Sequence, residues 1–342
     1  MGHRDDVWTV LAVGALVVVG VLDAVVAGPG FDGVLVVGPV IASATLSLRR
    51  TLALAVAAVV AAFVIAGAND RLFDASGMIR MAGVAGVSGF CVVAAQWRER
   101  RENVLQRVTR VAEVAQLAIL RPIPARVGTV AFASRYLSAA DQAFIGGDLY
   151  EVVPSTRGVR VVVGDVRGKG LEAVHLAALV LGSFREAATV EASLDGVAKA
   201  VDRAVAAEIA LEDFVTAVFV EFRAGGEVEV VNCGHHPPLR VSPRSVEYLS
   251  PPEASPPLGL APICTSELYV LDRGDRLMLY TDGLIEARGP DRSFFELAPD
   301  TLSRLRRRSL DGALEGLVGE VLRHAGGHLD DDLALLLAEV RA

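Results

Sequence analysis

Residues 161–170 read VVVGDVRGKG and join a run of apolar residues to an aspartate and a glycine-rich turn. The valines before Asp165 predict a buried β-strand that ends at this acid. The glycines after it permit a sharp turn, and the apolar stretch 171–190 beyond the turn predicts a helix. This segment therefore predicts a mixed α and β domain with a carboxylate at a strand end.

Other acids stand at similar places in the chain. They lie in three motifs: GGDLYE at 146–151, LMLYTDGLIEA at 277–287 and HLDDDLALLL at 328–337. A single Asp-Gly pair is usually only a turn, but acids at the ends of several apolar strands form a stronger pattern. Gathered carboxylates repel one another unless a cation neutralises them. Hard oxygen ligands favour Mg²⁺ or Mn²⁺ over zinc.

The glycines of residues 164–170 also suggest a nucleotide-binding loop. A P-loop needs four residues between its first glycine and the Gly-Lys-Ser/Thr triplet. Here three residues separate Gly164 from Gly168, and Gly170 stands where the hydroxyl residue is required. The spacing of the dinucleotide-binding motif is not met either, so both interpretations are excluded.

The chain after Val127 alternates short apolar runs with turn residues. Strands are predicted at 158–163, 214–222, 228–232, 268–271 and 276–281, and helices at 171–190, 194–209 and 302–324. The strands come in groups, and the short connection around Gly225 makes one pair antiparallel. A regular alternation of strand and helix is missing, which predicts the α+β class.

The hydrophobic residues, 52% of the chain, are concentrated before residue 97. Four apolar segments follow one another at 7–27, 34–48, 52–67 and 81–97. A helix needs about 20 residues to cross a bilayer, so the sequence predicts an all-α transmembrane bundle of about four helices. A buried bundle in a soluble protein is disfavoured, since four such segments leave no polar face. A cleavable signal peptide is disfavoured because residues 1–6 are scarcely basic.

The arginines around these segments predict the orientation in the membrane. Arg49 and Arg50 separate the second and third segments, and three more arginines follow the fourth, at positions 98, 100 and 101. The other two loops carry mainly aspartates. Positive residues favour the cytoplasmic side, which predicts a multi-pass protein of the cell membrane, in contact with lipid, whose region after Arg98 is cytoplasmic.

Residues 97–120 place valines and alanines at spacings of three and four, the pattern of an amphipathic helix with a coiled-coil stripe. Pro122 and Pro124 end this helix. Whether it is a passive spacer or transmits a signal remains open at this stage. Our hypothesis is a homodimer formed through residues 97–120 that switches the following domain on.

Net charge and cysteine content exclude further classes. The formal charge of −8 argues against a dedicated nucleic-acid binder, which needs a basic face. Three cysteines, at positions 91, 233 and 264, are far apart in the sequence. They predict neither a disulfide framework nor a metal site.

Six motifs in order resemble one family. GGDLYE, VGDVRGKGLEA, NCGHHPPL, PPLGL, YTDGLIEAR and DDDLALLL resemble the metal-dependent protein phosphatases of the type 2C (PPM) superfamily, and in particular their bacterial SpoIIE-like branch. The resemblance covers residues 112–340. It implies a layered antiparallel β-sandwich flanked by helices. It also implies hydrolysis of phosphoserine or phosphothreonine on a regulatory protein, such as a phosphorylated anti-sigma-factor antagonist.

The resemblance also implies roles for individual residues. Asp165 matches the acid that bridges two Mn²⁺ or Mg²⁺ ions, with the Val166 carbonyl as a further ligand. Asp148 matches an acid that serves the second ion, largely through water, and Asp282 and Asp331 match ligands of the first. Two such ions activate a water for attack on phosphorus, so no nucleophilic side chain is required. The choice of Asp331 over Asp330 and Asp332 remains open.

Other positions near these motifs allow two interpretations each. His235 and His236 either act near the phosphate or belong to a structural turn, and the turn is favoured. Glu151 replaces a common second aspartate, and Arg167 replaces a common serine and either contacts phosphate or is an exposed loop residue. A basic cluster near Asp148 is missing from the sequence, which suggests that substrate affinity comes from protein docking.

The predicted organisation has three parts: a transmembrane region at 1–97, a signalling helix at 98–121 and a phosphatase domain at 122–342. The predicted activity is that of a membrane-anchored protein phosphatase. Two alternatives remain: a catalytically weak or inactive membrane receptor that uses the domain to bind protein, and a structural anchor that recruits a partner. Neither alternative needs a cluster of carboxylates.

Overall fold

The computed structural model describes Gly14 and residues 35–68, 72–138, 146–209, 213–242, 245–298, 301, 304–306 and 309–341. It divides into two compact units, 1–107 and 108–342. The first predicted transmembrane segment, 7–27, lies outside the described residues except for Gly14.

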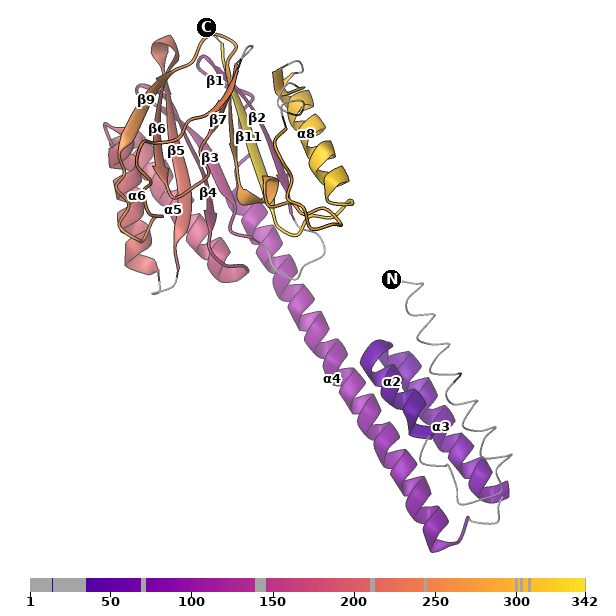
Figure 1. Cartoon of the computed structure of the whole chain (residues 1–342). Helices are drawn as coiled ribbons and strands as arrows, with labels where there is room; N and C mark the ends of the chain where they lie inside the picture. Colours follow the sequence, from indigo (N-terminus) through magenta and orange to yellow (C-terminus); the bar gives the residue numbers. More distant parts are fainter. Residues whose placement is uncertain are drawn as a thin grey trace. The chain divides into compact units, whose positions relative to one another are not determined.

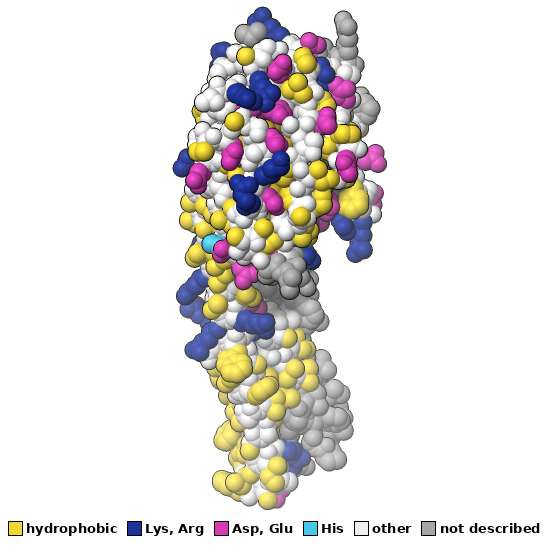
Figure 2. Space-filling view, turned by 90° about the vertical axis from the view of Figure 1, so that its left-hand side faces the viewer, with side chains coloured by type: hydrophobic (Ala, Val, Ile, Leu, Met, Phe, Trp, Pro, Cys, Tyr) yellow, Lys and Arg dark blue, Asp and Glu magenta, His cyan; other side chains and the backbone are white. Residues whose placement is uncertain are grey.

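The first unit is helical where it is described. It contains α2 (Val37–Thr45), α3 (Leu48–Ala68) and the start of α4 (Ala75–Ile119). Three described helices are long and apolar enough to cross a membrane: α3, α4 and α5 (Leu171–Val190). Figure 2 shows mainly hydrophobic side chains on the surface of the helices of this unit. Many of these exposed residues belong to α3, including Val56, Val60 and Phe63, as expected for a surface that faces lipid.

The second predicted segment, 34–48, is not a full span. Helix α2 has nine residues, about 14 Å at 1.5 Å per residue, against a hydrocarbon core of about 30 Å. The chain turns at Leu46 and re-enters a helix at Leu48. Polar groups of α4 hold this corner: Arg98 donates to the Leu46 carbonyl, and the Leu48 amide donates to Glu99 at 2.6 Å. The prediction of a spanning helix here was wrong because apolar composition does not show where a helix ends.

The fourth apolar segment and the predicted signalling helix form one continuous helix, α4, which ends before Leu120. Its part beyond residue 107 belongs to the second unit. Val104, Val108 and Val111 are exposed along it. These valines of the predicted stripe therefore lie on the exposed surface of a helix.

The second unit is a sandwich of two antiparallel sheets (Figure 1). The six-stranded sheet has the order β1 (Arg126–Val127), β2 (Val130–Leu137), β11 (Leu333–Val340), β10 (Arg276–Tyr280), β7 (Leu239–Val241) and β8 (Val246–Tyr248). The five-stranded sheet has the order β3 (Leu149–Ser155), β4 (Gly158–Val166), β5 (Val215–Arg223), β6 (Glu227–Cys233) and β9 (Ser266–Val270). The predicted α+β class and the antiparallel sandwich are confirmed.

Helices cover both outer faces of this sandwich. Helices α5 and α6 (Leu194–Glu208) contact the five-stranded sheet, and α8 (Leu310–His324) contacts β2 and β11 (Figure 1). Strand β11 is apolar from Leu333 to Ala338 because both of its faces are covered. Leu336 and Ala338 join the core between the sheets, while Leu335 and Leu337 join the core under α8. A strand covered on both faces needs apolar residues at every position.

Helix α5 has the composition of a membrane span, but its apolar residues pack inside this domain. Leu176, Val180 and Phe184 belong to the core that α5 shares with the sheets. The predicted helix 302–324 is described as a long helix only from Leu310. Ser309 caps its first turn by accepting a hydrogen bond from the Gly312 amide, in the way expected of an N-cap serine.

Candidate active site

Asp148 and Asp165 lie together at one end of the five-stranded sheet. Leu149 pairs with Gly164 across β3 and β4. Asp148 directly precedes Leu149 and Asp165 directly follows Gly164, so the two acids stand at neighbouring positions. The amide of Val166 donates to the Gly147 carbonyl at 3.2 Å. A Cβ atom at Gly147 would lie 2.5 Å from the Val166 carbonyl oxygen, so only glycine permits this approach.

Asp282 and Asp331 lie at the corresponding end of the six-stranded sheet. Strand β10 ends at Tyr280, and Asp282 opens the short helix η3 (Asp282–Leu284) that follows. Asp331 comes just before β11, the partner of β10. A Cβ atom at Gly283 would lie 1.9 Å from the Asp332 carbonyl oxygen, and this close approach brings the two segments together.

Thr281 connects the two sheets at this end. Its buried hydroxyl donates to a carboxylate oxygen of Asp148 at 2.7 Å and accepts from the Ala334 amide at 2.9 Å. Gln116 of α4, also buried, donates to the Asp148 carbonyl at 3.3 Å. Asp148 is therefore fixed by strand β3, by the strand pair β10–β11 and by the end of α4.

Three acids of this cluster, Asp148, Asp165 and Asp282, have raised pKa values. Burial and the charge of Asp282 raise the pKa of Asp165 to about 8. Burial and the charge of Asp165 raise the pKa of Asp148, and burial and Asp331 raise that of Asp282. Such shifts mean that removing a proton costs free energy unless a positive charge is supplied. The structure thus gathers the predicted residues Asp148, Asp165, Asp282 and Asp331 in one site.

The three consecutive acids before β11 have different surroundings. Asp332 is buried and accepts hydrogen bonds from the Tyr136 hydroxyl at 2.5 Å and the Gly146 amide at 3.1 Å. Asp330 is exposed. Asp331 is half-buried, raises the pKa of both Asp165 and Asp282, and pairs with Lys169 at 3.0 Å. These surroundings favour Asp331 as the acid of the cluster that faces a ligand.

The donor set consists of oxygens. Among the described residues, no group of three or more His, Cys, Asp or Glu side chains is arranged to hold a metal ion. Mg²⁺ and Mn²⁺ are commonly bound by a few carboxylates and completed by water and carbonyl oxygens. The carboxylate oxygens and the Val166 carbonyl beside Gly147 match this chemistry.

Sequence reasoning missed several residues of this site. Lys169 supplies the positive charge beside Asp331 and lowers the pKa of Asp165; its signal was a lysine inside the glycine-rich turn. Thr281, Gln116 and Tyr136 gave no comparable signal, because their partners are distant in sequence.

The structure also shows the surroundings of Glu151 and Arg167, for which the sequence allowed two interpretations. Glu151 is buried and pairs with Arg185 of α5, which also donates to the Ile119 carbonyl at the end of α4 at 3.0 Å. Glu151 therefore binds an arginine rather than extending the cluster. The Arg167 guanidinium stacks over the Phe214 ring, 5.3 Å from its centroid. Cys233 and Cys264, which the sequence separates, are buried with their sulfurs 3.9 Å apart.

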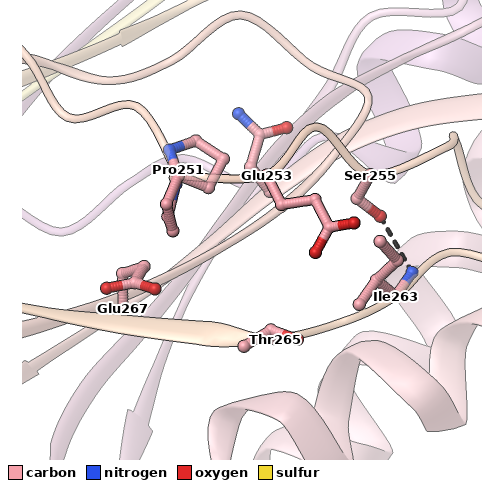
Figure 3. Close-up of a pocket in the computed structure, with 8 residues that line it drawn as sticks. Pro251, Glu253, Ser255, Ile263, Thr265 and Glu267 are labelled. Carbon is pink, nitrogen blue, oxygen red and sulfur yellow. Dashed lines mark hydrogen bonds between the residues drawn. The ribbon is translucent and has the colours of Figure 1, made fainter.

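One cavity adjoins the cluster, and a second is lined by residues outside it. The first, of about 230 Å³, is lined by residues 283, 286–288 and 329–331. The other, of about 70 Å³, is lined in part by Glu253 and Glu267 (Figure 3). Figure 3 shows Glu253 reaching from its loop toward the segment that carries Thr265 and Glu267. Two carboxylates make this smaller cavity unsuitable for a phosphoryl group.

The chain is similar to a known family and to solved structures. The family described as stage II sporulation protein E (SpoIIE) matches residues 155–341, more than half of the chain. The RsbU and RsbW domains of Rv1364c from Mycobacterium tuberculosis match with 29% identity and a TM-score of 0.55, over 63% of this chain and 61% of that one. The matched part thus spans less than two thirds of the mycobacterial chain.

Two further structures share the fold at lower identity. The SiaA-PP2C domain of Pseudomonas aeruginosa matches with 20% identity and a TM-score of 0.57, over 72% of this chain and 99% of that one. The PP2C phosphatase domain of SpoIIE from Bacillus subtilis, with a fragment of its regulatory domain, matches with 14% identity and a TM-score of 0.50, over 62% and 63%. These similarities confirm the predicted phosphatase-type fold of the second unit.

Proposed function

Since the chain belongs to the SpoIIE family of type 2C protein phosphatases, we propose that it is a membrane-anchored serine/threonine phosphatase that acts on a phosphorylated regulatory protein. The observation that carries this proposal is the cluster of four aspartates, which come from four strand ends. Burial and neighbouring acids raise the pKa of three of them, Asp148, Asp165 and Asp282. Such a cluster is costly in a protein that only binds a partner.

In this proposal, Asp165 would be the acid shared by two ions, and the Val166 carbonyl would be a further ligand. Asp148, Asp282 and Asp331 would supply the remaining carboxylates. When bound, two Mn²⁺ or Mg²⁺ ions supply Lewis acidity and lower the pKa of a water molecule. The protein contributes the fixed geometry: Thr281 orients the Asp148 carboxylate, and Lys169 holds Asp331 at the glycine-rich turn. In this proposal water attacks the phosphorus, so no side chain acts as the nucleophile and no covalent phosphoenzyme is needed.

The substrate proposed is a phosphorylated anti-sigma-factor antagonist, a suggestion supported by the family resemblance. The mycobacterial relative combines its RsbU domain with an RsbW domain in one chain, which supports a role among such regulators. Membrane anchoring is supported by α3 and α4, which are long and apolar enough to cross a bilayer. The arginines at positions 49, 50, 98, 100 and 101 support a cytoplasmic phosphatase domain.

The test is phosphate release by the purified full-length protein from a phosphoserine peptide and from p-nitrophenyl phosphate. We expect activity with Mn²⁺ that is lost with EDTA and restored when Mn²⁺ is added in excess. Asp282→Asn should reduce kcat by roughly 10²–10³-fold, which is about 3–4 kcal/mol in activation free energy. The matched control is Asp272→Asn, an aspartate whose side chain is 89% exposed. Metal-independent activity, or an active Asp282→Asn variant, would contradict the proposal and favour the receptor or anchor alternatives.

The proposed homodimer through residues 97–120 has its own test. Val104, Val108 and Val111 are exposed at spacings of four and three, the pattern of a coiled-coil seam. Replacing all three with aspartate should convert a dimer to a monomer in light scattering and lower phosphatase activity. Arg110→Asp, an exposed position between them, is the control for added charge. A triple variant that remains dimeric would rule out this seam.

A further inference from the structure

The turn after β6 places His235 in the interior. Gly234 takes a φ of 70°, and a Cβ atom there would lie 2.8 Å from Pro257, so the turn requires glycine. The Asn232 side chain then binds the backbone of His235 twice: its oxygen accepts from the His235 amide at 2.8 Å, and its nitrogen donates to the His235 carbonyl at 2.9 Å. The turn at Gly234 and the two hydrogen bonds of Asn232 together fix the direction of the imidazole.

Both ring nitrogens of His235 are engaged inside the protein. Nε2 lies 3.0 Å from the Tyr280 carbonyl oxygen, and Nδ1 lies 3.0 Å from the Thr216 hydroxyl. A carbonyl only accepts, so Nε2 carries the proton and Nδ1 accepts from Thr216. Burial and the nearby His236 lower the pKa of His235 to about 3, so the ring is neutral at physiological pH. With no free nitrogen, the ring is not placed to act as an acid or base.

The two partners of this imidazole belong to different sheets, and each adjoins the carboxylate cluster. Thr216 of β5 pairs in register with Asp165 of β4, and its hydroxyl also lies 3.4 Å from the Asp165 carbonyl. Tyr280 is the last residue of β10 and is followed by Thr281 and Asp282. His235 therefore connects the strand neighbour of one proposed metal ligand to the strand that leads into another.

We propose that His235 is a positioning residue, whose imidazole ties β5 to β10 and thereby sets the separation of Asp165 and Asp282. The inference rests on the proposed function, because it takes the cluster as the metal site. Among the described residues, three other side-chain links join the two sheet ends at this site: Thr281 to Asp148, Asp332 to the Gly146 amide, and Lys169 to Asp331. Without His235, the two sheet ends keep their core packing, but the separation of Asp165 and Asp282 is less firmly fixed.

The test measures Mn²⁺ binding separately from catalysis in the full-length protein. Calorimetry gives the Kd for Mn²⁺, and phosphate release from the phosphoserine peptide gives the half-saturating Mn²⁺ concentration, kcat and KM. His235→Leu should weaken Mn²⁺ binding about 10- to 100-fold, the range found when groups that orient metal ligands are removed. At saturating Mn²⁺, KM for the peptide should remain within about threefold, because the tie acts on the metal ligands and not on substrate docking.

Two further variants sharpen the test. His235→Gln places an amide near the position of Nε2, so it should retain the bond to Tyr280 and restore part of the Mn²⁺ affinity. Thr216→Val keeps the shape of Thr216 and removes only its hydroxyl, so it should weaken Mn²⁺ binding even if His235→Leu does not fold. His175→Gln, on an exposed histidine of α5, is the matched control and should bind Mn²⁺ like the unaltered protein.

The outcomes separate this inference from the proposed function. Unchanged Mn²⁺ affinity in folded His235→Leu and Thr216→Val would overturn the positioning role, even if both variants unfold at lower temperature. Mn²⁺ binding that depends on His235 in a protein that releases no phosphate would overturn the proposed function and leave the positioning role standing. An unaltered protein that does not bind Mn²⁺ would overturn both.

Discussion

Asp165→Asn is expected to lower kcat for phosphate release by roughly 10³-fold or more, about 4 kcal/mol in activation free energy. Several acids act on Asp165: the charges of Asp282, Asp331 and Asp332 all raise its pKa. Asparagine keeps the shape of the side chain but removes the charge that two ions would share. The measurement is single-turnover phosphate release at saturating Mn²⁺, with the exposed Asp272→Asn as the control. Retention of activity within tenfold would contradict the bridging role.

The same variant should change how the stability of the metal-free protein depends on pH. The pKa of Asp165 is raised from 3.8 to about 8 in the folded state. An acid with a raised folded pKa contributes stability that is fully present below the unfolded pKa and is lost as the pH rises through the folded one. With EDTA present, the thermal midpoint of the unaltered protein should therefore fall between about pH 4 and about pH 8.

Asp165→Asn should reduce this pH dependence, because asparagine does not titrate. Mn²⁺ added to the unaltered protein near pH 8 should raise the midpoint, because an ion that binds only the folded state stabilises it. A thermal midpoint that is equally pH-dependent in both proteins would show that Asp165 does not titrate in this range.

Arg160→Leu is expected to give the largest loss of stability in the phosphatase domain, about 3–5 kcal/mol, the range for breaking a buried ion pair. Arg160 and Glu221 face each other across β4 and β5, are almost fully buried, and are 2.7 Å apart. Arg160 also donates to the carbonyls of Ala188 and Glu191 at the end of α5. Its removal leaves the buried Glu221 charge to Arg223, 3.1 Å away, and leaves these helix carbonyls without their donor.

The thermal midpoint should accordingly fall by roughly 10 °C for a domain of this size. Lys199→Ala, which breaks an exposed ion pair with Asp195, is the control and should cost less than about 1 kcal/mol. The double variant Arg160→Leu/Glu221→Leu should recover much of the loss, since it removes both charges. A midpoint unchanged in Arg160→Leu would show that the pair contributes nothing net.

Activity gives a second readout for Arg160. Asp165 lies five positions beyond Arg160 along β4, about 16 Å at 3.3 Å per residue. Arg160→Leu should therefore retain near-normal kcat below its unfolding temperature. Stability and catalysis thus depend on opposite ends of the same strand.

Much of the domain was predictable from local sequence. Strands around 158–163, 214–222 and 276–281 form nearly where their apolar runs predict them, as β4, β5 and β10. The helix predicted at 171–190 is observed as α5. These elements were predictable because side-chain periodicity and β-propensity act over a few residues.

The sequence prediction failed where the position of a helix end, rather than the apolar composition of the helix, decided the structure. The short helix α2 ends at Thr45, inside the segment 34–48 that was predicted as one helix, because the chain turns there and polar groups of α4 bind the corner. Helix α5, which was predicted correctly as part of this domain, is also apolar enough for a membrane span, yet it is packed in the core of the domain. Composition reports how much apolar surface a segment has, but not whether lipid or protein covers it.

The sequence alone determined that several aspartates stand at strand ends and that their order resembles a phosphatase family. Only the tertiary structure decided which groups meet. Thr281 binds Asp148 across 133 residues, and Tyr136 binds Asp332 across 196. The bond from Tyr136 distinguishes buried Asp332 from half-buried Asp331. The sequence, with three consecutive aspartates, does not make this distinction. The physical reason is that these distances depend on pairing between strands far apart in the chain, whereas sequence patterns record the preferences of neighbouring residues.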